Sequence, residues 1–215
     1  MDSGFHVLSI SAGDNWGYGA SSQMQTPVYR GTATLSQPAY VSERGKKYSN
    51  SCILRNFAGG ISLATSYKCG LSPPRIIQVD PHTPCGAVQY RDGDTVLSVK
   101  SHFWSTRVDL TRTDDSQTFE WNYTRTEVNS KKRRVLVLSK TDASRQQQIV
   151  LAVLLRTDGT RTPGTSKWSS GNGGQLLINS KAEAHMTEAL IVATCLMMLK
   201  KEVDRAQGAA AAAAT

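Results

Sequence analysis

Four consecutive basic residues form the densest charge cluster of the chain: Lys131, Lys132, Arg133 and Arg134. The surrounding residues 120–170 hold ten Lys or Arg against four Asp or Glu, and so carry most of the net charge of +8. Cations this close together can bind the phosphates of lipid headgroups or nucleic acid, or act as a nuclear import signal. They can also simply keep a solvated hairpin from pairing with other strands. We take the run as the candidate anionic-ligand site, with anionic membrane lipid favoured over nucleic acid, and the plain hairpin stays an open alternative.

Metal chemistry would have to come from the short stretch that contains Asp80, His82 and Cys85, which Pro81 and Pro84 make stiff. Zinc sites usually gather four ligands in paired spacing, and the remaining cysteines and histidines supply no second pair. A nucleophile–base pair of Cys85 and His82 would need an orienting third group and an oxyanion hole, and the sequence indicates neither. We therefore predict no metal site and no cofactor.

Acid–base catalysis without a metal would depend on the histidines. His102 stands beside Phe103 and Trp104, which is more typical of a strand residue than of a general base, and His185 is expected to pack near the start of a helix. The sequence contains no nucleophile elbow, no H-E-x-x-H motif and no dinucleotide-binding fingerprint. We therefore lean toward a protein that is not an enzyme. The alternative is a small enzyme acting on a hydrophobic metabolite, with His102 or His82 as its acid or base.

Short apolar or alternating segments, separated by turn residues, have to position these side chains. In the clearest of them Phe119, Trp121 and Tyr123 alternate with polar residues, as in a strand with one buried face. Ten or more strands with short connections predict a meandering antiparallel barrel or sandwich. The predicted strands are Phe5–Ile10, Pro27–Gly31, Ala33–Leu35, Ile53–Phe57, Ile61–Tyr67, Arg75–Val79, Ala87–Arg91, Thr95–Lys100, Phe103–Arg112, Thr118–Thr124, Arg134–Lys140, Gln148–Arg156 and Gln175–Ile178.

The C-terminal segment has a different pattern. Ala189–Leu199 is apolar except for Thr194, and on a helix its apolar residues cover every face. A helix that is hydrophobic all round has to be enclosed, and this one rises only about 16 Å, half the thickness of a bilayer core. Ser180–Glu183 matches a capping box at its start. We therefore predict a helix over about residues 182–206 that is buried inside the protein.

Composition sets the broad class of the protein. A chain of 215 residues is long enough to bury a core without disulfides or metals. Its hydrophobic content of 39% excludes a disordered chain, and its net positive charge suggests anionic partners. We find no transmembrane segment and no secretory signal. We expect a cytoplasmic protein with free thiols, with a membrane surface or the nucleus as alternative locations.

Composition also divides the chain into three parts. Residues 1–50 are rich in Ser, Gly, Gln and Pro, and are expected to form a loosely structured segment with short strands packed on the barrel. Residues 51–206 are expected to form the barrel and its central helix. The Ala-rich tail, residues 207–215, is expected to be disordered.

An apolar C-terminal helix plugging a barrel of about twelve antiparallel strands resembles the tubby C-terminal and LURP-one-related superfamily, whose fold phospholipid scramblases are thought to share. The stretches Val99–Phe103, Thr118–Trp121, Asp158–Gly164 and Ala189–Arg205 are similar to those of fungal members. The resemblance covers roughly residues 50–206 and lies in the architecture and the helix, not in a catalytic motif. Tubby proteins bind phosphoinositide headgroups through Lys and Arg on the barrel exterior, so the resemblance implies such a ligand, but no binding residue carries over by alignment.

Together these observations predict an all-β fold with one helix: a closed antiparallel β-barrel of about twelve strands around a buried hydrophobic C-terminal α-helix. Because the helix fills the lumen, function is expected on the outer surface or the rim loops, which favours a binding module. We expect a peripheral adaptor that engages anionic phospholipid through residues 131–134. A protein-interaction factor with an exposed edge at Val135–Leu138 is a further alternative.

Overall fold

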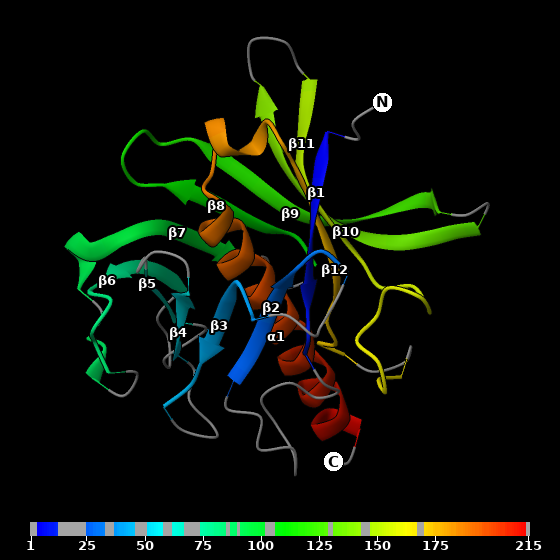
Figure 1. The fold of residues 1–215 in the computed structure, drawn as a ribbon, viewed down its shortest axis with the longest axis horizontal. Helices are drawn as coiled ribbons and strands as arrows, with labels where there is room; N and C mark the ends of the chain where they lie inside the picture. The colour runs from blue at the N-terminus through cyan, green and yellow to red at the C-terminus, as the bar shows by residue number, and fades with distance from the viewer. Residues whose placement is uncertain are drawn as a thin grey trace.

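The computed structural model describes residues 4–12, 25–32, 37–45, 51–57, 62–66, 74–84, 87–89, 91–101, 106–128, 131–142, 147–166 and 170–213. Within these residues twelve strands close into one antiparallel barrel, and helix α1 (Glu188–Ala213) runs through its centre (Figure 1). The strands are β1 (Phe5–Ile10), β2 (Gln25–Arg30), β3 (Tyr40–Glu43), β4 (Ser51–Asn56), β5 (Ser62–Ser66), β6 (Arg75–Val79), β7 (Thr95–Ser101), β8 (Val108–Arg112), β9 (Thr118–Val128), β10 (Lys131–Asp142), β11 (Gln147–Leu155) and β12 (Gly174–Asn179).

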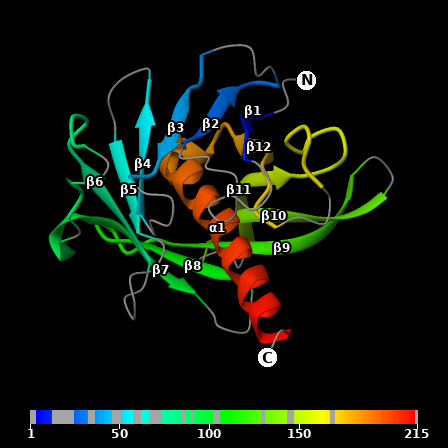
Figure 2. The ribbon, with the colours of Figure 1, turned by 90° about the horizontal axis from the view of Figure 1, so that it is seen from below.

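The barrel is a meander that closes on itself. Each strand pairs with its neighbours in the chain, and β12 pairs with β1 in a register that joins Phe5 to Asn179 and Ile10 to Gly174. Figure 2 shows α1 crossing the interior, with strands around it. The structure therefore confirms the predicted fold class, a closed antiparallel barrel of twelve strands with one C-terminal helix.

The core lies between the inward faces of the strands and the whole circumference of α1. Phe119 and Trp121 alternate inward on β9, as the sequence predicts, and every residue from Ala189 to Leu199 on α1 is buried. Each fully buried Leu, Ile or Val side chain contributes about 1.5–3 kcal/mol relative to an exposed one. Because the segment Ala189–Leu199 contacts the barrel interior on all sides, apolar residues occupy every face of it.

The barrel begins earlier in the chain than the sequence predicts. We expected residues 1–50 to be loosely structured, but β1, β2 and β3 lie there and are strands of the closed barrel. Their buried side chains include Leu8 and Ile10 of β1 and Val28 of β2, together with two polar residues, Thr26 and Ser42. The sequence predicts β1 with its observed bounds. Because backbone hydrogen bonds to neighbouring strands need no particular side chain, the pattern does not reveal that β1, β2 and β3 close the barrel. The predicted strand Ala33–Leu35 lies outside the described residues.

Both ends of the helix also differ from the prediction. Ser180–Glu183 does not form a capping box, because the 3₁₀ helix η3 (Ala182–Ala184) occupies this position and no side chain caps it. The α-helix starts one residue after Thr187, whose hydroxyl accepts a hydrogen bond from the N–H of Leu190 (3.4 Å). The Ala-rich tail is not disordered as far as Ala213 but continues the helix. Alanine is the best helix former and readily extends a helix that is already nucleated.

The predicted strand Ala87–Arg91 is wrong over its described residues, 87–89 and 91. The N–H of Ala87 bonds to the carbonyl of Pro84 (3.0 Å) in a local turn, and the chain enters β7 through the 3₁₀ helix η2 (Asp92–Asp94). Asp and Gly favour such turns because Asp bonds its own backbone and Gly tolerates unusual dihedral angles.

In the part of the chain that the structure describes, no helix combines the length and the hydropathy needed to cross a bilayer.

Candidate anion-binding site

The basic run lies in a strand and not in a loop. Residues 131–134 are the first four of β10, and they pair with the end of β9. The pairing of β8 with β9 ends at Trp121, and that of β11 with β10 ends at Leu136, so residues 124–128 and 131–135 pair only with each other among the described residues. This segment, which we call the basic hairpin, extends away from the barrel in both ribbon views (Figures 1 and 2).

Strand alternation divides the basic run between the two faces of the hairpin. Arg134 lies on the same face as Leu136, which is buried in the barrel, and Arg133 lies on the opposite face. Lys132 is exposed and has Glu127 as its cross-strand partner, whereas the side chain of Lys131 lies outside the described residues. The four residues therefore do not form a single patch.

Arg134 is surrounded by other cations. Its guanidinium carbon lies 4.1 Å from the centroid of the Tyr123 ring, and its cross-strand partner is Arg125. Like charges directly opposite each other in an antiparallel pair are unfavourable. Burial lowers the pKa of Arg134, and the charges of Arg156, Arg205 and Arg125 lower it further. Among the described residues no carboxylate forms an ion pair with Arg134, so the repulsion there is not neutralised.

Next to this face the structure contains a cavity of about 520 Å³, at the barrel mouth through which the C-terminal part of α1 leaves. Its volume is within the range of small-molecule sites, about 300–1,000 Å³. None of the described residues that line it is a histidine, so it does not match the apolar, histidine-containing pocket that the enzyme alternative requires. The lining residues are Thr106, Tyr123, Arg134, Arg156, Arg161, Ser170, Asn172, Glu202, Arg205 and Ala206.

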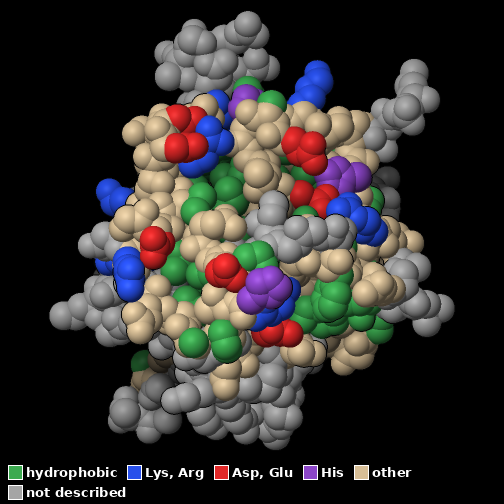
Figure 3. All heavy atoms as spheres, turned by 60° about the vertical axis from the view of Figure 1, so that its left-hand side comes forward, with side chains coloured by type: hydrophobic (Ala, Val, Ile, Leu, Met, Phe, Trp, Pro, Cys, Tyr) green, Lys and Arg blue, Asp and Glu red, His purple; other side chains and the backbone are tan. Residues whose placement is uncertain are grey.

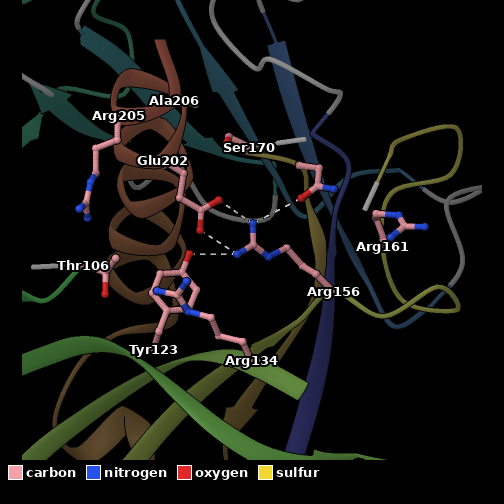
Figure 4. Close-up of a pocket in the computed structure, with 10 residues that line it drawn as sticks. Thr106, Tyr123, Arg134, Arg156, Arg161, Ser170, Glu202, Arg205 and Ala206 are labelled. Atoms are coloured by element: carbon pink, nitrogen blue, oxygen red, sulfur yellow. Dashed lines mark hydrogen bonds and ion pairs between the residues drawn. The ribbon is translucent and has the colours of Figure 1, made fainter. Parts of the chain in front are cut away.

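A double ion pair lies at the centre of this cavity. Arg156, which directly follows β11, donates from Nη1 and Nη2 to the two carboxylate oxygens of Glu202 on α1, both at 2.7 Å. Nη2 also donates to the hydroxyl of Tyr123 (3.0 Å), and Nη1 reaches Oδ1 of Asn172 (3.4 Å). Figure 4 shows Arg156 between these partners, with Arg134 against the Tyr123 ring and Arg161 and Arg205 at the two sides.

Glu202 is largely buried, and burial raises its pKa to about 7, although the N–H of Gly171 donates to it (3.1 Å) and acts in the opposite direction. Burial likewise lowers the pKa of Arg156. Burial therefore acts against the charged form of both partners, and the double ion pair between them acts in the opposite direction. The residue before Glu202, Lys201, has its pKa lowered to about 8, mainly by burial and in part by Arg205.

Gly171 fits the backbone closely against α1. It has a φ of +77°, and a Cβ at this position would lie 2.2 Å from Cγ2 of Val203. Only glycine combines this dihedral angle with this approach. The sequence predicts a turn in Gly171–Gly174; the structure places these residues where the β11–β12 connection reaches the helix and β12 begins.

The cavity has an excess of positive charge. Four arginines and one glutamate line it, which leaves three positive charges among the described lining residues. Arg161 forms an ion pair with Asp158 outside the cavity (3.1 Å). The face toward β5 and β6 is different, because acidic and basic side chains are interspersed there (Figure 3). The arrangement can hold an anion at the barrel mouth.

The other end of α1 carries a carboxylate that is already satisfied. Glu188 accepts hydrogen bonds from Arg30 (2.9 Å) and Tyr40 (2.8 Å), and Nε2 of His6 lies 2.6 Å from it. Burial acts to raise the pKa of Glu188, but the hydrogen bonds from Tyr40, Arg30 and His6 lower it below its usual range. A negative charge in the first turn also complements the helix dipole. This cluster holds the start of the helix in the barrel mouth.

The histidines and cysteines singled out by the sequence are not brought together over the described residues. His82 is exposed in a turn, where its N–H donates to the Asp80 carboxylate (2.7 Å). Cys85, Cys69 and His102 lie outside the described residues. His185 follows η3 as expected, and burial followed by the charges of Lys140 and Arg112 lowers its pKa. Cys52 and Cys195 are buried and form no disulfide.

The predicted protein-interaction edge at Val135–Leu138 is wrong. Val135, Leu136 and Leu138 are buried, and β10 has a partner strand on either side from Leu136 onward. Closure of the barrel removes the edge that the sequence pattern suggested.

Comparisons with family models, with curated proteins and with solved structures found no match for the chain. The candidate site therefore depends on its own geometry. The sequence pattern places Arg134 in the candidate site but does not indicate Arg156, Glu202 or Arg205. The available signal was topological: in a barrel plugged by a helix, the end of β11 and the end of the buried helix segment meet at one mouth.

Proposed function

We propose that the chain is a non-enzymatic, tubby-like binding module in the cytoplasm, a peripheral adaptor that engages anionic phospholipid headgroups through the basic hairpin. The observation that carries this proposal is the projection of the hairpin beyond the barrel with arginines on both faces. A projecting two-stranded element can approach a flat surface without hindrance from the barrel wall.

Electrostatics supports a membrane surface as the partner. Each Lys or Arg held near an anionic leaflet contributes about 1 kcal/mol, and the attraction falls off within a Debye length. Three such side chains, Lys132, Arg133 and Arg134, would together contribute about 3 kcal/mol. This is a weak attachment that depends on salt, as expected for a reversible adaptor.

The test is co-sedimentation with vesicles. Neutral phosphatidylcholine vesicles are compared with vesicles that also contain phosphatidylserine or a phosphoinositide, at low and at moderate salt. We expect binding only with acidic lipid and weaker binding at higher salt. Changing Lys132, Arg133 and Arg134 to Gln should reduce partitioning about 100-fold, since 1.4 kcal/mol corresponds to a factor of ten.

A matched control removes the same charge elsewhere. Arg91, Lys100 and Lys181 are exposed cations outside the hairpin, and their triple change to Gln gives the same net charge as the hairpin variant. The control should keep most of the binding. Equal losses of binding in the two variants would mean that net charge, and not the hairpin, determines binding. No binding of the wild type to any vesicle would overturn the adaptor function.

A further inference from the structure

We propose that the cavity at the C-terminal mouth of the barrel is a binding site for a phosphomonoester dianion. This inference goes beyond the membrane-adaptor function: it concerns a small ligand inside a pocket, whereas the adaptor function concerns the outer surface of the hairpin. The two share only Arg134.

The first argument is charge. Arg134, Arg156 and Arg205 line the cavity together with one carboxylate, that of Glu202. A fourth lining arginine, Arg161, forms its ion pair with Asp158 (3.1 Å). Arg134 has an aromatic ring on one side and cations around it, with no ion-pair partner among the described residues. A dianion placed beside Arg134 would offset the repulsion that Arg156, Arg205 and Arg125 exert on it. A phosphomonoester carries about −1.5 to −2 at pH 7 on a single group.

The second argument is hydrogen-bonding chemistry. Thr106 and Ser170 supply hydroxyls at the same cavity, so donors other than arginine are available for the third phosphate oxygen. Planar guanidinium groups match phosphate oxygens in bidentate geometry. Tyr123, the aromatic residue among the described lining residues, is covered by Arg134, so these residues offer no open aromatic face to an apolar ligand. Its volume of about 520 Å³ leaves room for a polar group attached to the phosphate.

The third argument is that the site already holds one anionic group of the protein. The Glu202 carboxylate accepts from both terminal nitrogens of Arg156 and from the N–H of Gly171. These are the partners that an oxyanion would take. Glu202 therefore sets the affinity, because its charge opposes an incoming dianion and its oxygens occupy Arg156.

The test is isothermal titration of the full chain with glycerol 3-phosphate and with inorganic phosphate. Glycerol and citrate serve as a neutral and a carboxylate reference. We expect saturable binding of one equivalent of glycerol 3-phosphate, and no comparable binding of glycerol or citrate. Citrate binding as tight as that of glycerol 3-phosphate would overturn the phosphomonoester assignment.

Neighbouring residues on the two faces of β10 provide matched variants. Arg134→Gln, on the cavity face, should weaken binding at least ten-fold, whereas Arg133→Gln, on the opposite face, should change it less than two-fold. Arg205→Gln, at an exposed position of α1, should also weaken it, and Glu202→Gln should tighten it several-fold. Thermal unfolding of each variant checks that it is folded. Equal effects of Arg133→Gln and Arg134→Gln, or no saturable binding of either phosphate probe, would overturn the site.

Vesicles that contain phosphatidic acid separate a lipid source from a soluble one, because this lipid carries a phosphomonoester and phosphatidylserine does not. Preference for phosphatidic acid that Arg134→Gln removes and Arg133→Gln retains would assign the phosphate to a lipid. Soluble binding without that preference would assign it to a free metabolite. If the wild type binds glycerol 3-phosphate but no vesicles, the adaptor function alone is overturned. If it binds acidic vesicles but neither soluble phosphate probe, the cavity site alone is overturned.

Discussion

Glu188 and Glu202 lie at the two ends of the buried part of α1, and the protein shifts their pKa values in opposite directions. Glu188 is held by Arg30, Tyr40 and His6, and these hydrogen bonds outweigh the effect of burial. Glu202 has one guanidinium and one backbone N–H, and burial prevails. At the barrel mouth with Glu188 the surrounding groups therefore favour the charged carboxylate, whereas at the mouth with Glu202 burial disfavours it.

The first prediction concerns the acid limb of the stability profile, that is, the decrease of the free energy of unfolding at acidic pH. Because the pKa of Glu188 is lower in the folded than in the unfolded state, its ionised form stabilises the fold above about pH 4.5, and this stabilisation is lost as the pH falls through the folded pKa. Glu188→Gln should lower the free energy of unfolding at pH 7 by about 2 kcal/mol, typical of hydrogen bonds to a charged group. It should also flatten the acid limb. Urea unfolding at a series of pH values measures both effects.

The exposed Glu183 is the control for this prediction. Glu183→Gln removes a carboxyl from the same mouth of the barrel without removing a hydrogen-bonded cluster, and should change the free energy of unfolding by less than about 0.5 kcal/mol. If the Glu188→Gln profile ran parallel to that of the wild type below pH 4.5, the cluster would not be the source of the acid limb.

The second prediction has the opposite sign. A carboxyl whose pKa is near 7 in the folded state and near 4.5 in the unfolded state binds more protons when folded, so its contribution to stability falls as the pH rises from about 5 to 8. The difference in unfolding free energy between wild type and Glu202→Gln isolates this group. We expect it to change by on the order of 2–3 kcal/mol over this window.

The control for the second prediction is Glu127→Gln, which removes an exposed carboxyl from the basic hairpin. Its difference from the wild type should stay constant between pH 5 and 8. A wild-type minus Glu202→Gln difference that is equally constant would mean that the ion pair with Arg156 compensates fully for burial.

The sequence predicts the architecture well because the architecture depends on patterns that stay local. The alternation of Phe119, Trp121 and Tyr123 defines a strand wherever it occurs, and Ala189–Leu199 has to be enclosed whatever surrounds it. By contrast β3, Tyr40–Glu43, has only four residues and little apolar alternation. Its place in the barrel is set by pairing with its neighbouring strands, and the local sequence does not indicate that pairing.

The candidate site was predictable only in part for the same reason. A run such as Lys131–Arg134 is visible in the sequence, but which of its members faces a cavity depends on the strand register. Arg156 and Glu202 are far apart in the chain, and nothing local to either one indicates a partner. They meet because the barrel closes around the helix, which is a long-range property.

The third prediction tests the close packing of the β11–β12 connection on the helix. Gly171→Ala places a Cβ against Val203 at a φ of +77°, so it combines backbone strain of about 1–2 kcal/mol with overpacking of about 1–3 kcal/mol. Gly164→Ala has the same backbone strain, with a φ of +80°, but no atom within 4 Å of the new Cβ. Chemical unfolding should show a larger loss for Gly171→Ala, and equal losses would mean that the helix end moves aside easily.

The fourth prediction uses the thiol of Cys195, in the buried part of α1, as a probe of barrel opening. Cys195 is completely buried, and burial raises its pKa to about 12. Thiol reagents attack the thiolate, so in the native protein Cys195 should react only when α1 leaves the lumen. Because the helix is enclosed on all sides, this opening should coincide with global unfolding. Pulsed alkylation with peptide mapping by mass spectrometry should give a labelling rate for Cys195 equal to the global unfolding rate, with denatured protein as the fully reactive control. Labelling of Cys195 much faster than unfolding would instead reveal a partially open barrel in which the helix slides out while the strands stay paired.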